Sequence, residues 1–436
     1  MAARRPVQGL VLTLALASTA SAHAAAPGPE VGAATRAFKE LERTCRADAG
    51  ALWGGSLCAP VLVVDDQSRR FIASEAPKQG RYPGPPFTGE LPPQVTVANT
   101  AMEWAGTLWV QLLWPLPEDP TALRVMLAHE AFHHFQRRQG LTTGDRANAH
   151  LDSARGRTLL QLEWRALARA LESRGATRRA AVQDALGFRT ARRALFPKAT
   201  EEERALEQNE GLAEYTGVRL GAPTAAARLA LAKTALAETP KQPTLVRSLG
   251  QASGPAYGLL LDDAAGARWR REALARADLG ELLARALSLD TKPPSEELLA
   301  SRGKAYGAPE LEQREAERER VAQARLVTLR KRFVEGPVLR LPFERMNIQF
   351  KPGELVPIEG AGTVYPSGRI VDAWGSLTVR AGVLVDEPWK SATVPLPLET
   401  HGNKLSGDGW ELELAPGWEQ APGARTGDVT VRKTPG

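Results

Sequence analysis

The alternation of apolar and polar positions divides this chain into three stretches. Up to about residue 118, short apolar runs such as Pro60–Val64 and Thr107–Trp114 are separated by turn residues, which predicts strands beside one early helix. From Asp119 to about Ala300 the pattern is typical of helices. After Gly336, short alternating runs separated by Gly, Pro and Asp predict a small all-β module of sandwich or barrel type.

Capping signals indicate where several helices begin and end. Asp119 is a good N-cap, Pro120 suits the first helical position, and Gly140 is placed to end that helix. Thr200 and Glu203 have the spacing of a capping box. Helices are expected at Ala34–Arg46, Ser153–Arg174, Ala176–Leu195, Glu201–Leu220, Thr224–Ala237, Ala256–Ala265 and Pro309–Phe333. The chain is therefore expected to be an α+β protein.

The N-terminus predicts export. Arg4 and Arg5 precede the apolar stretch Gly9–Ala17, which is too short to span a bilayer, and Ala-x-Ala sites follow it. We expect a cleaved signal peptide at residues 1–26, a mainly helical domain with a small sheet at 27–335, and a β domain at 337–436. The mature protein would be periplasmic or secreted, without a membrane span.

The cysteine content and the charge indicate whether a disulfide forms and whether nucleic acid is a partner. In an oxidising compartment, Cys45 and Cys58 are expected to form one disulfide, although two buried free thiols are the alternative. The net charge is +6, but arginines alternate with acids, as in Glu312–Arg320, which favours a solvated helix face over nucleic-acid binding. Four tryptophans of the β region are expected in its core, with a carbohydrate or partner surface as the alternative: Trp374, Trp389, Trp410 and Trp418.

The candidate chemistry lies in His129-Glu130-Ala131-Phe132-His133, an HExxH motif within the helix that Asp119 caps. Residues four apart stack on one helix face, so His129 and His133 can reach one metal ion while Glu130 reaches its water. Zinc in such a site lowers the pKa of the water and polarises a carbonyl group. A polar patch on an amphipathic helix is the alternative, but it leaves a buried Glu beside two His without compensation.

A third ligand is expected from Asn209-Glu210-Gly211-Leu212-Ala213-Glu214-Tyr215. On a continuous helix Glu207, Glu210 and Glu214 would share one face, where their charges repel unless a cation or protein donors neutralise them. We expect Glu210 to bind the metal and Glu214 to accept a hydrogen bond from a ligand His. A solvated acidic face is the alternative. His134 points about 100° away from His133 on the helix, and His150 is a weaker candidate ligand.

These motifs resemble those of the gluzincins, zinc peptidases that combine HExxH with a Glu on a later helix. Asn209-Glu210-Gly211-x-Ala213 is similar to the NEGFA motif of the M1 aminopeptidases, and Glu210-x-x-Ala213-Glu214 to the ExxAD motif of the M48 peptidases, with Glu in place of Asp. The resemblance covers these two helices and leaves the subfamily open. It implies a zincin-like fold and one Zn²⁺ ion bound by His129, His133 and Glu210.

The resemblance implies two further roles. In M1 enzymes a later Tyr stabilises the oxyanion, and Tyr257 is the natural counterpart here; a structural Tyr is the alternative. A GAMEN motif upstream of HExxH binds the substrate amino group. Thr100–Trp104 contains Glu103 at the corresponding place but lacks the Gly and the Asn.

The sequence therefore predicts an exported zinc metallopeptidase acting on peptides or proteins. Glu130 would be the general base, and the substrate would lie along Thr107–Trp114. The choice between endopeptidase and aminopeptidase stays open. The alternatives are a zincin-like envelope protein used for binding or assembly without proteolysis, and a zinc hydrolase acting on a non-peptide bond.

Overall fold

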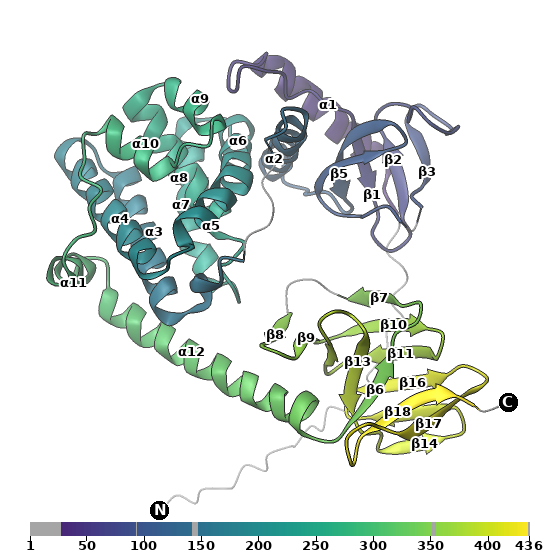
Figure 1. Cartoon of the computed structure of the whole chain (residues 1–436). Helices are drawn as coiled ribbons and strands as arrows, with labels where there is room; N and C mark the ends of the chain where they lie inside the picture. Colours follow the sequence, from purple (N-terminus) through teal and green to yellow (C-terminus); the bar gives the residue numbers. More distant parts are fainter. Residues whose placement is uncertain (1–27, 93, 142–146, 351–354, 435–436) are drawn as a thin grey trace, which may run out of the picture. The chain divides into compact units, whose positions relative to one another are not determined.

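The structure is a computed structural model that describes residues 28–92, 94–141, 147–350 and 355–434. The described residues combine helices with strands, so the predicted α+β class is confirmed (Figure 1). The chain divides into two compact units, unit 1 ending at Leu141 and unit 2 beginning at Thr142. The change from helices to strands expected near residue 336 lies within unit 2, where β6 begins at Val338.

Unit 1 is built on a five-stranded sheet with the order β3-β2-β1-β5-β4. The predicted hairpin is confirmed, because β1 and β2 pair antiparallel. β1 and β5 pair parallel, and β4 returns antiparallel to β5 as one of the two outer strands. The strands are β1 Val61–Val64, β2 Arg70–Ala73, β3 Phe87–Glu90, β4 Thr100–Trp104 and β5 Thr107–Leu113.

Helices α1 (Val31–Asp48) and α2 (Pro120–Arg138) pack together, and α2 also contacts β4 and β5. The predicted N-cap of α2 is confirmed, since an Asp119 carboxylate oxygen accepts from the Ala122 amide at 2.7 Å. Near the other end of α2, Arg137 Nη1 donates to the Ala101 carbonyl oxygen of β4 at 2.9 Å. The helix is thereby held by polar bonds as well as by its apolar face.

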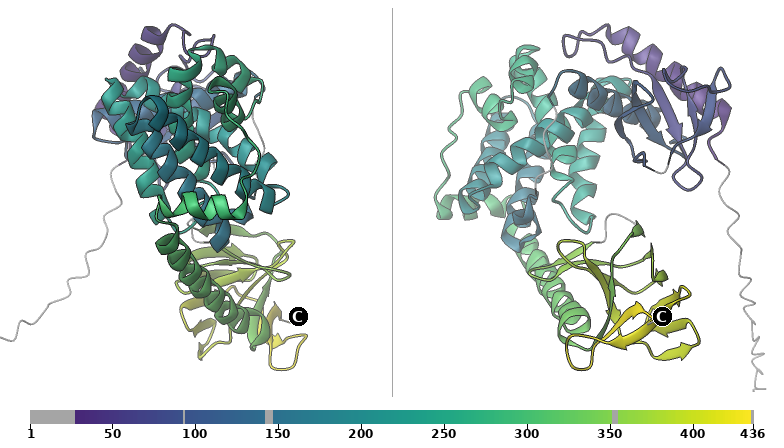
Figure 2. Two further views of the ribbon diagram at one scale, coloured as in Figure 1. Left: turned by 90° about the vertical axis from the view of Figure 1, so that its left-hand side faces the viewer. Right: turned by 45° about the vertical axis from the view of Figure 1, so that its right-hand side comes forward.

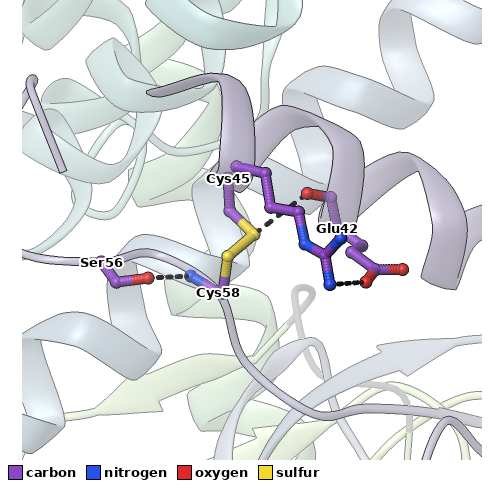
Figure 3. Close-up of a disulfide and its surroundings, with 5 residues drawn as sticks. Glu42, Cys45, Ser56 and Cys58 are labelled. Carbon is purple, nitrogen blue, oxygen red and sulfur yellow. Dashed lines mark hydrogen bonds and ion pairs between the residues drawn. A yellow bond between two sulfur atoms is a disulfide. The ribbon is translucent and has the colours of Figure 1, made fainter. Parts of the chain in front are cut away.

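The predicted disulfide between Cys45 and Cys58 is present and joins the end of α1 to the segment before β1 (Figure 3). The loop that it closes rests on α2. Trp53 packs on Phe132 with ring centroids 4.9 Å apart. A Cβ at Gly55 would lie 2.9 Å from Phe135 Cε2, so that position has room for glycine alone.

The helical part of unit 2 confirms the predicted helices, with shifted ends. α8 begins earlier than expected, at Leu249, and carries Pro255 inside it. The capping box at Thr200 and Glu203 is wrong, because α5 begins at Ala199 and Glu203 is buried among arginines. α3 and α4 pack side by side, and α12 is one long helix (Figure 2). The helices are α3 Ala154–Glu172, α4 Gly175–Leu195, α5 Ala199–Leu206, the π turn η2 Glu207–Gly211, α6 Leu212–Gly221, α7 Ala225–Glu238, α8 Leu249–Ala265, α9 Arg268–Leu274, α10 Leu279–Ala286, α11 Glu296–Lys304 and α12 Ala308–Arg330.

The C-terminal all-β region contains a six-stranded and a seven-stranded sheet that contribute side chains to one core. Trp374 and Trp410 are buried in that core as predicted, and Trp418 packs against it partly buried. Trp389 is 43 % exposed, so it is not a core residue. The strands are β6 Val338–Pro342, β7 Asn347–Phe350, β8 Val356–Ile358, β9 Gly362–Tyr365, β10 Gly368–Asp372, β11 Gly375–Val379, β12 Val383–Val385, β13 Ser391–Pro395, β14 Glu399–His401, β15 Lys404–Gly407, β16 Trp410–Leu414, β17 Trp418–Pro422 and β18 Val429–Lys433.

Among the described residues, no helix has the length and apolar character needed to cross a membrane. The expected signal peptide at residues 1–26 lies outside the described residues.

Removal of the disulfide should destabilise unit 1. The bridged cysteines are 13 residues apart, and closing a loop of about that length is worth about 3 kcal/mol. We expect Cys45→Ala/Cys58→Ala to lower the free energy of unfolding by about 2–4 kcal/mol in urea titrations. Wild-type protein under reducing conditions is the control and should match the double variant. An unchanged midpoint would contradict a stabilising role.

Candidate metal centre

The two motif histidines face each other across one turn of α2. His129 Nε2 and His133 Nε2 are 3.1 Å apart, and the ring centroids are separated by 4.8 Å. The predicted stacking of residues four apart therefore holds, and it directs one nitrogen of each ring to the same point. Glu130, between them in sequence, is 6 % exposed.

The second ring nitrogen of His133, Nδ1, contacts the side-chain amide of a buried residue, Gln136. His133 Nδ1 lies 2.9 Å from Gln136 Oε1, and Gln136 is 2 % exposed. Because a carbonyl oxygen only accepts, Nδ1 carries the proton and Nε2 keeps its lone pair. This is the arrangement by which proteins fix the tautomer of a metal-binding His.

His134 has a structural role. Its Nε2 donates to the Leu108 carbonyl oxygen of β5 at 3.2 Å, which ties α2 to the sheet. Burial, with a contribution from Arg138, lowers the pKa of His134 to about 4, although the bond to Leu108 opposes the shift. The imidazole is therefore neutral at ordinary pH. Its position agrees with the prediction that it is a poor ligand.

Glu210 lies in a π turn, which the sequence did not reveal. In η2 the Leu212 amide donates to the Glu207 carbonyl oxygen, five residues back. The expected shared face of Glu207, Glu210 and Glu214 is therefore wrong for Glu207, which is buried. Glu210 is partly exposed, and its carboxylate accepts from Asn209 Nδ2 at 2.9 Å and from Gln251 Nε2 at 3.3 Å. The expected role of Glu214, a partly exposed residue of α6, stays a prediction.

His129 and His133 on α2 and Glu210 in η2 are the predicted ligands, and each offers one ligand atom. The histidines belong to unit 1 and Glu210 to unit 2, so their joining in one site is part of the function proposed for the protein.

The structure contradicts the predicted role of Tyr257. The side chain is fully buried within unit 2, and its hydroxyl donates to Glu163 Oε1 at 2.7 Å. Burial, and then the charge of Glu163, raises the pKa of Tyr257 well above its ordinary value. A phenol enclosed in this way has no access to a substrate oxyanion, so the alternative of a structural Tyr is correct.

The structure also corrects the strand expected to hold a substrate. Thr107–Trp114 contains β5, which is paired on one side with β1 and on the other with β4. The pairing with β1 spans Val110–Leu113, so this part of β5 has no backbone groups left for a peptide. β3 and β4 are the outer strands of the sheet, and the side chain of Glu103 on β4 is exposed.

A buried cluster of charged residues in unit 2 was missed by the sequence analysis. It comprises Glu163, Arg189, Arg192, Arg193, Glu203, Glu207 and Asp278, and His150 joins it through Glu203 at 2.8 Å. His150 is thus engaged by Glu203 within unit 2. The available signal was that Arg189 and Arg192 continue the apolar stripe of Val182, Ala185 and Leu186 on α4.

Comparison with known proteins gives no match: no family model, no curated protein and no solved structure corresponds to this chain.

The cluster should make the free energy of unfolding decrease as the pH becomes acidic. Burial alone would raise the pKa of Asp278, but the charges of Arg189 and Arg193 outweigh burial and hold this pKa well below its ordinary value. The charge of Arg192 likewise holds the pKa of buried Glu203 well below its ordinary value. The stabilisation of the fold by these two carboxylates is complete above the ordinary carboxyl pKa of about 4. It is lost as the pH falls through their lowered pKa values.

We expect Asp278→Asn to lower the free energy of unfolding at pH 7 by about 3–5 kcal/mol, because it leaves buried arginine charge unpaired. The decline of stability below about pH 4 should also become shallower. Denaturant unfolding across pH measures both. Asp263→Asn, at an exposed carboxylate that pairs with Arg178 on the surface, is the control and should change neither. Parallel pH curves for wild type and Asp278→Asn would contradict the assignment.

Proposed function

We propose that this protein is a zinc-dependent peptidase with a zincin-like catalytic fold, in which one Zn²⁺ ion is bound by His129, His133 and Glu210. The observation that carries the proposal is the convergence of the two Nε2 atoms 3.1 Å apart, with His133 Nδ1 held by buried Gln136. Two imidazoles and a carboxylate are a ligand set that suits zinc. Zinc, when bound, would polarise a water molecule and the scissile carbonyl group.

Glu130 is the proposed general base. It follows His129 on α2 and is nearly buried, so its carboxylate acts where competing water is scarce. It takes a proton from the attacking water and passes it to the amine nitrogen that leaves. Tyr257 has no part in this mechanism.

An extended substrate would add to the outer edge of β4. The backbone of an outer strand can pair with a peptide, which provides affinity without requiring a particular side chain. α2 packs on β4 within unit 1, so a peptide on this edge would lie near the motif helix. If the substrate has a free N-terminus, exposed Glu103 is the carboxylate on this strand that could bind it.

An exported location fits the disulfide of unit 1, because disulfides persist in oxidising compartments. The proposed enzyme would act on peptides or proteins in the periplasm or outside the cell.

The peptidase proposal is tested by Glu130→Gln. Without a base, turnover of a mixed peptide pool should fall at least about 10²-fold, while the zinc content stays at one ion because the ligands are intact. Glu118→Gln, at an exposed carboxylate just before α2, is the matched control. Full turnover by Glu130→Gln would refute the mechanism. Zinc binding without hydrolysis by wild type would favour a binding or assembly role.

Gln136→Met tests the support of His133. The substitution keeps an unbranched side chain of similar size but removes the acceptor for Nδ1–H, so the ring loses its fixed tautomer and orientation. We expect zinc affinity to fall about 10–100-fold, as measured by competition with a chelator. Gln139→Met, on the exposed end of the same helix, serves as the control. Equal affinities for both variants would show that Gln136 does not support the ligand.

A further inference from the structure

The buried charged cluster of unit 2 meets the π turn that carries Glu210 at Glu207, which Arg189 binds most closely and Arg193 approaches to 3.8 Å. Arg189 Nη1 donates to Glu207 Oε1 at 2.6 Å, and Nη2 donates to Glu207 Oε2 at 2.5 Å. Both side chains are at most 2 % exposed. A bidentate guanidinium–carboxylate pair fixes orientation as well as distance, and it does so most strongly where water is absent.

Arg189 is itself held from several directions. Its guanidinium also contacts Glu163 at 3.3 Å and Asp278 at 3.0 Å. It lies 5.1 Å from the ring centroid of Tyr257, whose hydroxyl bonds to the same Glu163. The partners belong to α3, α8 and the start of α10, so Arg189 ties Glu207 to a rigid frame.

Glu207 is the first residue of the π turn that contains Glu210. A π turn is less stable than a regular helical turn, so other contacts must maintain it. The change of register it introduces lets Glu207 face the buried cluster while Glu210 remains partly exposed.

The opposite side of the turn is held by close backbone packing against α8. A Cβ at Gly254 would lie 2.1 Å from the Gly211 carbonyl oxygen, and a Cβ at Gly250 would lie 2.8 Å from the Leu206 carbonyl oxygen. These contacts restrict movement of the turn toward α8. The bond from Arg189 restrains its first residue on the cluster side.

We infer that Arg189 is a positioning residue for the metal site: through Glu207 it holds the π turn that presents the Glu210 carboxylate. The inference rests on the proposed function, because it assigns Glu210 to a metal. It gives the buried cluster a role in ligand geometry beyond the stability of unit 2.

The test is zinc affinity of the full chain, measured by chelator competition, together with hydrogen exchange of the Leu212 amide without metal. Arg189→Lys and Glu207→Gln should each weaken zinc binding about 10–100-fold and speed exchange of this amide, whose bond to Glu207 defines the turn. Arg192→Lys is the matched control. Arg192 is equally buried, but it binds Glu163 and Glu203 and has no bond to Glu207, so zinc affinity should stay near that of wild type.

A double-variant comparison separates positioning from general destabilisation. In a Glu210→Gln background, Arg189→Lys should cause no further loss of zinc affinity, because its effect passes through Glu210. A further loss there, or equal weakening by Arg189→Lys and Arg192→Lys, would overturn the inference. If Arg189→Lys does not fold, Glu207→Gln, which keeps the shape of the side chain, decides by the same criteria. Absence of zinc binding by wild type would refute the proposed function and this inference together, whereas zinc binding insensitive to Arg189 and Glu207 would refute the inference alone.

Discussion

The cost of removing charge from water governs the helical part of unit 2. Arg189, Arg192 and Arg193 leave α4 toward the interior, where each guanidinium must meet carboxylates in suitable geometry or destabilise the fold. The carboxylates come from α3, α5, η2 and the residue that caps α10. Apolar contacts tolerate small shifts, but directional bonds of this kind do not. The cluster therefore ties these elements to one arrangement and provides a fixed base for the turn that carries Glu210.

Unit 1 holds its motif helix in a different way. α2 is joined to the sheet by two polar bonds, from His134 to β5 and from Arg137 to β4. Its other side supports the loop closed by the disulfide, through Phe132 and Phe135. These contacts leave His129 and His133 with their Nε2 atoms directed to one point. Phe132, His134, Phe135 and Arg137 are thus structural, and they hold the helix that carries His129 and His133.

In the proposed enzyme, different structural elements provide the base, the metal ligands and the strand that binds the substrate. The base and two ligands lie on one helix, so their mutual geometry follows from helical repeat alone. The proposed third ligand, Glu210, belongs to the other unit, and its turn begins at Glu207, which a buried ion pair holds. In the proposed enzyme a peptide pairs with β4, which lies at an edge of the sheet, and not with β5, which lies between β1 and β4.

The sequence by itself determined the features that local rules control. These include the α+β class, the capped helix of the HExxH motif, the β1–β2 hairpin, the disulfide and the change to strands after the last helix. Tertiary structure alone decided the π turn at Glu210, the burial of Tyr257, the pairing of β5 on both sides and the partners of Arg189. Each of these is fixed by groups from distant segments: which carboxylates surround an arginine, or which strand lies beside another. Local propensity carries no information about such partners, because their free energy exists only once the distant segments have come together.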